Sequence, residues 1–132
     1  MSRYTKPARE PKRVVITGVS AITPLGLTLE ESWKNALAGK SGIAPITKFD
    51  TTGFDVSFAG EIKGFDADAF IPKKEQKKME PFIHYAIAGT KMALDDAKLE
   101  ITPEIGERAG CLIGVGMGGL PLIEDQMKKV LE

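Results

Sequence analysis

The pattern of apolar and polar positions predicts strands and helices in alternation. Two short apolar runs, Arg13–Val19 and Cys111–Val115, are rich in aliphatic residues and border glycine, which is typical of strands buried in a sheet. Between them, Phe82–Ala97 carries apolar residues at helical spacing. We therefore expect an α/β fold in which the two runs lie parallel in one sheet, joined by right-handed crossovers. The expected buried helix face consists of Ile83, Ala86, Ile87, Thr90, Ala93, Leu94 and Ala97.

Local sequence signals predict the ends of the other elements. Thr28 and Glu31 form a capping box for a helix that Gly39 ends. Short helices are expected at Lys73–Met79 and directly after Thr102, and Ser57–Ile62 is expected to form a short strand or hairpin arm. Further expectations concern packing: Phe49, Phe54, Phe58 and Phe65 would pin the irregular stretch to the core, and Ile123, Met127, Val130 and Leu131 would form the inner face of a final helix with Pro121 in its first turn.

Length and charge exclude several classes of protein. The 132 residues suffice for one domain, and the 18 basic and 18 acidic side chains balance. This balance gives no reason to expect nucleic acid or a membrane as a partner. A single cysteine excludes an internal disulfide and fits a reducing compartment. Residues 1–12 are polar and basic, and we expect a disordered lead-in there and not a secretion signal.

The segment Gly114–Leu120 is the most unusual stretch of the chain. Its glycines match G-x-G-x-x-G between an expected strand and an expected helix. A dinucleotide site would also need a second strand that ends in an acidic residue about twenty residues later, beyond Glu132, and the motif falls late, after an excursion unlike a first βαβ unit. The alternative is a tight strand end that lines a pocket, which we favour. The triplet Gly39-Lys40-Ser41 is not the end of a P-loop, because Lys34 stands where its first glycine belongs.

Few side chains offer catalytic or metal-binding chemistry. Cys111 is the only thiol, and its place in an apolar run predicts an inert, packed side chain. His84 is the only histidine and is expected at the edge of its helix, so the sequence supports no metal cluster. Asp66 and Asp68 are interpreted as turn and capping residues. We expect neither a cofactor nor a metal.

One basic cluster stands out. Lys73, Lys74, Lys77 and Lys78 are close in sequence, and the last three share a helix face. A solvated face is the default interpretation, and a docking site for an acidic partner is the alternative.

Several motifs, in order, resemble the β-ketoacyl synthases, and in particular the elongating type II enzymes of fatty-acid synthesis. The resemblance covers nearly everything from Lys12 onward. The matching stretches are Arg13–Gly18, Thr23–Gly26, Trp33, Leu37–Ile43, Phe49–Thr51, Phe58–Gly60, Lys74–Met79 and Gly114–Leu120.

This resemblance implies a thiolase-like fold with α-β-α-β-α layers, a homodimer, a cytoplasmic location and acyl carrier protein as partner. It implies decarboxylative Claisen condensation of an acyl thioester with malonyl-acyl carrier protein, using one cysteine and two histidines. The family's nucleophile lies in a later segment, so no catalytic residue is assigned here. Residues 13–132 are then the N-terminal portion of a longer synthase domain, and this segment alone is expected to be inactive.

Two sets of residues inherit a binding role from the resemblance. Met117, with Gly116 and Gly118, matches the position that gates the acyl pocket. Lys74, Lys77 and Lys78 match the positions that bind the carrier protein, with lysine at Lys77 where arginine is common. Two other functions stay open: a catalytically silent partner such as a chain-length factor, and a nucleotide-binding module.

Overall fold

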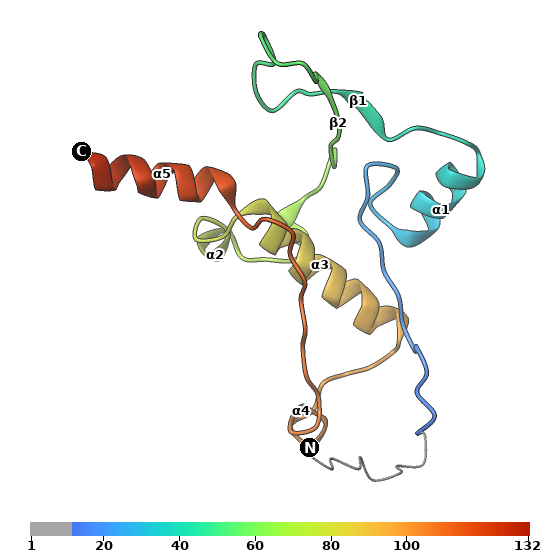
Figure 1. Ribbon diagram of the computed structural model, residues 1–132. Helices are drawn as coiled ribbons and strands as arrows, with labels where there is room; N and C mark the ends of the chain where they lie inside the picture. Colours follow the sequence, from blue (N-terminus) through green and yellow to red (C-terminus); the bar gives the residue numbers. More distant parts are fainter. Residues whose placement is uncertain (1–11) are drawn as a thin grey trace, which may run out of the picture.

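The computed structural model describes residues 12–132, and the expected lead-in, apart from Lys12, lies outside this part. Its longest element, α3 (Pro81–Asp96), lies at the centre of the molecule (Figure 1). The remaining elements, in chain order, are α1 (Leu29–Leu37), β1 (Ile43–Pro45), β2 (Phe58–Gly60), the 3₁₀ helix η1 (Ala67–Ala69), α2 (Lys73–Gln76), α4 (Pro103–Gly106) and α5 (Leu120–Leu131).

Helix α3 matches the expected helix almost residue for residue. Pro81 occupies its first turn, where the missing N–H of proline costs nothing. An N-terminal segment runs along it, because the Ser20 hydroxyl donates a hydrogen bond of 2.7 Å to the Gly89 carbonyl. The fully buried residue of α3 is Ala88, which lies on the face opposite the expected apolar stripe. The stripe itself is only half-buried, and Thr90 in it is exposed.

The two expected parallel strands are absent from the described residues. Residues 13–19 and 111–115 have no ladder partner, and apolar side chains on them are open to solvent, with Ile16 85% and Leu112 97% exposed. A parallel strand exists only where a neighbouring strand satisfies its backbone groups, and here neither segment has such a neighbour. The prediction of a parallel sheet is therefore wrong for this part of the chain.

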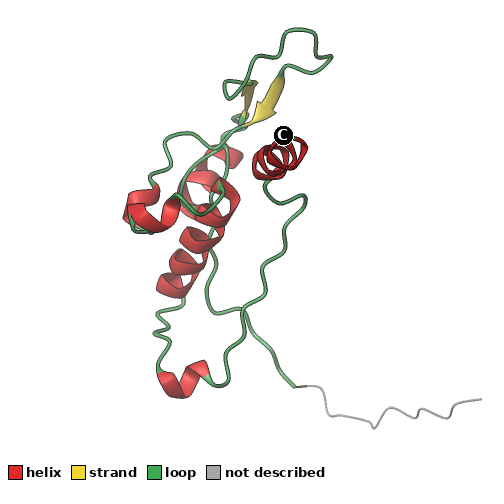
Figure 2. Cartoon of the chain, turned by 90° about the vertical axis from the view of Figure 1, so that its left-hand side faces the viewer, coloured by secondary structure: helices red, strands yellow, loops and turns green. Residues whose placement is uncertain are grey.

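The sheet that does form is an antiparallel hairpin. Strand β1 pairs with β2 in the register Ile43↔Gly60 and Pro45↔Phe58, which confirms the strand expected within Ser57–Ile62 (Figure 2). Beyond the paired residues, the buried Glu61 carboxylate holds the hairpin together. It accepts hydrogen bonds from the Thr47 hydroxyl at 2.7 Å and the Thr47 amide at 3.0 Å.

The capping signals are confirmed. The Thr28 hydroxyl accepts a hydrogen bond of 3.1 Å from the Glu31 amide, and the Glu31 carboxylate in return accepts one from the Leu27 amide at 2.9 Å. Thr102 caps α4 through the Ile105 amide. Helix α2 ends at Gln76, three residues earlier than expected, and continues as tight turns in which the Lys78 amide donates to the Glu75 carbonyl.

The described chain has a very small core. Ile71 and Ala88 are its buried apolar residues, and the accessible surface is 11675 Å². A compact monomer of 14.3 kDa would expose about 6,800 Å². Within residues 12–132, no helix packs extensively against another element. The apolar runs at residues 13–19 and 111–115, which a sheet would normally cover, are therefore exposed to solvent.

Two packing predictions are wrong as a result. Phe65 does pack, edge-on against Tyr85 of α3 and stacked on Phe70. The three other aromatic residues expected to pin this stretch are exposed: Phe49, Phe54 and Phe58. The expected inner face of α5 is exposed too: Ile123, Met127, Val130 and Leu131. Along residues 12–132, no helix is both long and apolar enough to cross a membrane.

Candidate functional site

The lysine patch, defined as Lys73, Lys74, Lys77 and Lys78, lies on α2 and the turn after it, and all four side chains are exposed. Two of its members have acidic partners. The Lys73 ammonium lies 3.0 Å from the Asp68 carboxylate, and that of Lys78 lies 3.2 Å from Glu75. Lys74 and Lys77 form no ion pair with any described residue. The patch therefore presents two unneutralised cations to solvent.

The ion pair at the start of the patch shifts both of its pKa values. A hydrogen bond from Gln76, and then one from Lys73, lowers the pKa of Asp68. The hydrogen bond to Asp68 raises the pKa of Lys73. Both groups keep their charge near neutral pH, so Asp68 neutralises Lys73. The unpaired positive charge of the patch is then carried by Lys74 and Lys77.

Two side chains fix the patch to the rest of the molecule. The Gln76 side-chain amide donates to the Asp68 carboxylate at 2.9 Å and to the Ile71 carbonyl at 2.7 Å. The Nε2 atom of His84, on α3, lies 3.3 Å from the Gln76 carbonyl. His84 is half-buried, as its predicted place at the helix edge requires, and it joins α3 to the end of α2. Its role here is structural.

The glycine-rich segment is extended up to Gly116 and then turns into α5. A Cβ atom at Gly114 or Gly116 would meet nothing within 4 Å, so neither glycine is required there by a neighbour in the described chain. Gly118 has a φ of +72°, which favours glycine. Met117 is 73% exposed. The described residues thus leave Met117 without a pocket around it.

Beside this segment lies a hollow along α3. Residues 113–116 form one side, and α3 residues such as Phe82, Ala86 and Ala93 form the floor, with Ser20 at the edge. The predicted apolar stripe of α3 therefore faces the glycine segment, although no sheet covers it.

The prediction that Cys111 is packed is wrong, because the thiol is exposed. It borders an almost wholly apolar hollow with Phe82, Ile87 and Ile113. The lining includes no carboxylate or imidazole, and its one cation, Lys91, donates to the Phe70 carbonyl at 2.8 Å. Nothing in this hollow activates a thiol as a nucleophile.

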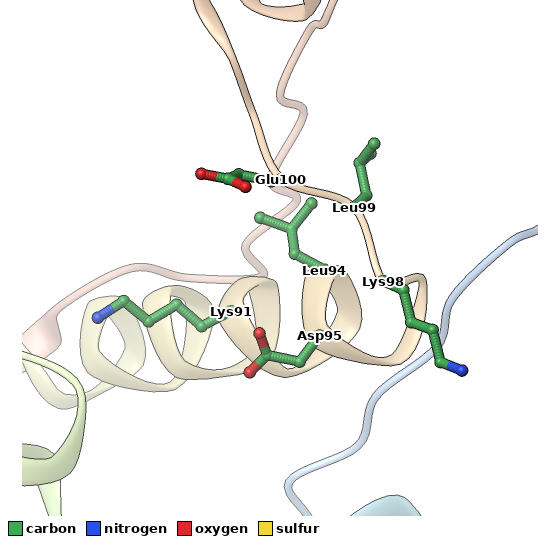
Figure 3. Close-up of a pocket in the computed structure, with 6 residues that line it drawn as sticks. All are labelled: Lys91, Leu94, Asp95, Lys98, Leu99 and Glu100. Carbon is green, nitrogen blue, oxygen red and sulfur yellow. The ribbon is translucent and has the colours of Figure 1, made fainter.

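A further hollow lies at the C-terminal end of α3 (Figure 3). Here Lys98 has a φ of +51°, and the Leu99 amide donates to the Leu94 carbonyl at 3.0 Å. The Lys98 amide likewise donates to the Asp95 carbonyl at 3.0 Å, which completes a Schellman motif. No sequence signal predicts this ending, because the left-handed position carries lysine and not glycine. The hollow is a helix terminus and holds no constellation of catalytic groups.

Metal and phosphate sites find no support in the described geometry. No group of three or more His, Cys, Asp and Glu side chains within residues 12–132 is placed to hold a metal ion. The start of α5, where a nucleotide phosphate would bind, is occupied by the Glu80 side chain, which packs on Gly119. A carboxylate there repels phosphate, so the geometry favours the pocket-wall interpretation of the glycines.

Comparison with known proteins identifies the family. The family model for the β-ketoacyl synthase N-terminal domain matches residues 11–131. A 3-oxoacyl-[acyl-carrier-protein] synthase 2 of Synechocystis is 46% identical over 93% of this chain and 30% of its own length. The protein of that name from Vibrio cholerae is 48% identical over 92% of this chain and 29% of its own length. The chain thus spans about 30% of the length of these relatives.

The solved structure of the ishigamide ketosynthase/chain length factor gives a TM-score of 0.57 at 37% identity, covering 65% of this chain and 21% of that chain. This likeness supports the prediction that the chain forms part of a thiolase-like fold. Together with the match along almost every described residue, it confirms the resemblance inferred from the motifs. The chain belongs to the β-ketoacyl synthase family and matches the N-terminal domain of that family.

Proposed function

We propose that this chain is the N-terminal part of a condensing enzyme that elongates acyl chains in fatty-acid synthesis. The observation that carries this proposal is the identity of 46–48%, over more than nine-tenths of the chain, to proteins named 3-oxoacyl-[acyl-carrier-protein] synthase 2. The reaction joins an enzyme-bound acyl thioester to malonyl-acyl carrier protein. Carbon dioxide leaves, the resulting carbanion attacks the carbonyl carbon of the acyl thioester, and the carbon–sulfur bond breaks to release the enzyme's thiolate.

The nucleophile of this reaction lies outside residues 12–132 in our proposal. A thiolate needs a base or a positive field beside it, and positioned donors must stabilise the oxyanion that forms. Cys111 borders an apolar hollow without such groups, and His84 is bonded to Gln76. Neither is assigned a catalytic role, and the chain by itself is expected to be inactive.

The part played by this chain is binding. The charge of the lysine patch supports docking of an acidic acyl carrier protein, because Lys74 and Lys77 are exposed without an ionic partner in the described chain. Met117, flanked by Gly116 and Gly118, is proposed to gate the acyl pocket. A flexible thioether side chain suits a gate that must yield to chains of different length.

The same proposal places the protein in a larger assembly. The open apolar runs at residues 13–19 and 111–115 would become strands of a layered α-β-α-β-α fold in the complete synthase. A cytoplasmic homodimer is proposed as the complete form.

Condensation by the full-length protein tests this function. The purified protein is mixed with acyl- and malonyl-loaded carrier protein, and carbon dioxide and the 3-oxoacyl product are measured. The expected product is two carbons longer than the acyl group supplied. The matched control is the 132-residue chain, for which no product is expected. A full-length protein that binds both substrates but neither decarboxylates nor condenses would overturn the proposal.

A second candidate function is a silent partner that sets chain length. The likeness to a ketosynthase/chain length factor is the observation that favours it. Such a protein would be inactive alone, would lack the cysteine and both histidines in its full sequence, and would alter the product length of an active synthase added to it. A nucleotide-binding module would instead be protected by a dinucleotide in a thermal-shift assay.

A further inference from the structure

The side chain of Glu80 packs directly on the backbone of Gly119. A Cβ atom at Gly119 would lie 2.5 Å from Cγ and 3.0 Å from Cδ of Glu80, so no larger residue fits unless Glu80 moves. Glu80 is the N-cap residue of α3, and Gly119 is the N-cap residue of α5. The contact therefore joins the starts of two helices, where the glycine-rich segment passes the upper end of α3 (Figure 1).

This contact restrains the gate loop, defined as Gly116–Gly119. Gly116 has open space around it, Gly118 adopts a left-handed conformation, and Met117 is exposed. Neither helix start has a side-chain capping bond. Packing of the Glu80 side chain on Gly119 is therefore what holds the loop here.

Glu80 also directly follows the segment, α2 and the turn after it, that carries the lysine patch. The Met79 amide donates to the Gln76 carbonyl at 3.0 Å, directly before Glu80 in the chain. His84 contacts the same carbonyl through Nε2 at 3.3 Å, and its own amide donates to the Glu80 carbonyl at 3.4 Å. Hydrogen bonds thus join the end of α2, Glu80 and the first turn of α3.

We propose that Glu80 is a positioning residue that fixes the gate loop relative to the lysine patch. A carrier protein docked on the patch would then place its acyl chain at a set distance and orientation from Met117. This inference rests on the proposed function, and it adds to it the residue through which the docking surface and the acyl gate are linked.

A double-mutant cycle in the full-length enzyme tests the link. Gly119→Ala introduces the clash with Glu80 and is expected to lower kcat/KM for long acyl groups by about tenfold relative to short ones. Glu80→Ala, added to Gly119→Ala, removes the clashing atoms and is expected to restore most of this loss. The matched control is Glu30→Ala on the exposed first turn of α1, which removes one negative charge away from both the lysine patch and the loop, and it should leave the acyl-length profile unchanged.

A second readout does not depend on condensation. Proteolytic cleavage within the gate loop is measured with and without bound carrier protein, and the carrier protein should change the rate in the wild type but not in Glu80→Ala. Strictly additive effects of Gly119→Ala and Glu80→Ala, or a loss of thermal stability alone with an unchanged acyl-length profile, would overturn the inference. A wild-type enzyme without condensing activity would overturn the proposed function instead, and the proteolysis result would then decide whether the link exists.

Discussion

The Asp96 carboxylate accepts a hydrogen bond of 2.8 Å from the backbone amide of Val19. This bond holds the open apolar segment at residues 13–19 against the end of α3, although no strand lies beside it. A backbone amide that bonds a charged side chain is fixed more firmly than one bonded to water. The direction of the N-terminal segment is therefore set by its bond to α3, without a neighbouring strand.

Replacement of Asp96 should destabilise the protein by freeing this segment. We expect Asp96→Ala to lower the free energy of unfolding of the full-length protein by about 1 kcal/mol, since the bond is exposed but charge-assisted. Urea unfolding measures the change. Asp95→Ala is the control, because the Asp95 side chain forms no hydrogen bond within the described chain, and an equal loss in both variants would contradict the role of the Val19 contact.

The carboxylate of Glu61 should make the hairpin sensitive to acid. The Thr47 hydroxyl, and then the Thr47 and Lys48 amides, lower the pKa of Glu61 from its ordinary value of 4.5. A pKa that is lower in the folded state stabilises the protein above the ordinary value, and this contribution is lost as the pH falls through the lowered pKa. The protection factors of the hairpin amides in hydrogen–deuterium exchange, which are corrected for the intrinsic pH dependence of exchange, should therefore fall as the pH drops below 4.5.

Replacement of Glu61 by glutamine separates the effect of the carboxylate charge from that of the side-chain shape. Glu61→Gln keeps an oxygen acceptor but cannot titrate, so its hairpin should exchange faster than the wild type at neutral pH and should show no further acid-dependent step. Glu30→Gln, on the exposed first turn of α1, is the control and should keep the wild-type pH profile. An identical acid response in Glu61→Gln would show that another group is responsible.

Lys98 stores backbone strain that a glycine would relieve. Its φ of +51° lies in the left-handed region, where a Cβ atom costs roughly 1–2 kcal/mol. Glycine also gains freedom in the unfolded chain, so we expect Lys98→Gly to raise the free energy of unfolding by a net amount of about 0.5 kcal/mol. Thermal unfolding measures it, and Lys98→Ala, which removes the same charge but keeps the Cβ atom, should show no gain.

Elements set by neighbours in sequence could be predicted, and elements set by distant partners could not. The caps at Thr28 and Thr102 and the whole of α3 follow from residues within one or two turns. The runs at residues 13–19 and 111–115 have strand-like composition, but a strand needs a hydrogen-bonded neighbour that the described residues do not supply. Burial of a helix face likewise needs a distant partner, and Ile123 and Met127 of α5 are exposed because no described element packs extensively against that helix.

The candidate site divides in the same way. The lysine patch is a local cluster, so its sequence revealed both its members and their exposure. The contact of Glu80 with Gly119 joins residues far apart in the chain, and no periodicity or motif indicated it. The apolar run around Cys111 predicts a buried thiol, but burial depends on the element that packs against the run, and Cys111 is exposed.

Met117 should control acyl length more than malonyl use. In the full-length enzyme, Met117→Gly removes the proposed gate, and we expect kcat/KM for long acyl groups to change by about tenfold relative to short ones. Kinetics with a series of acyl-carrier proteins measure this, and KM for malonyl-carrier protein should stay nearly constant. Met127→Gly, on exposed α5, controls for the loss of a methionine, and an unchanged acyl-length profile in Met117→Gly would refute the gate.

Reversal of charge at Lys77 tests the docking surface most directly. Lys77 is exposed and has no acidic partner in the described part of the chain, so Lys77→Glu replaces an attraction for an acidic carrier protein with a repulsion. We expect the Kd of the full-length enzyme for the carrier protein to rise by about tenfold at low salt. The difference should shrink as salt is added, because the Debye length falls to about 8 Å at physiological ionic strength. Lys34→Glu on α1 is the matched control, since it makes the same change of charge at an exposed position outside the lysine patch and the loss should be smaller. Binding that is indifferent to Lys77→Glu at every salt concentration would mean that the patch is only a solvated face.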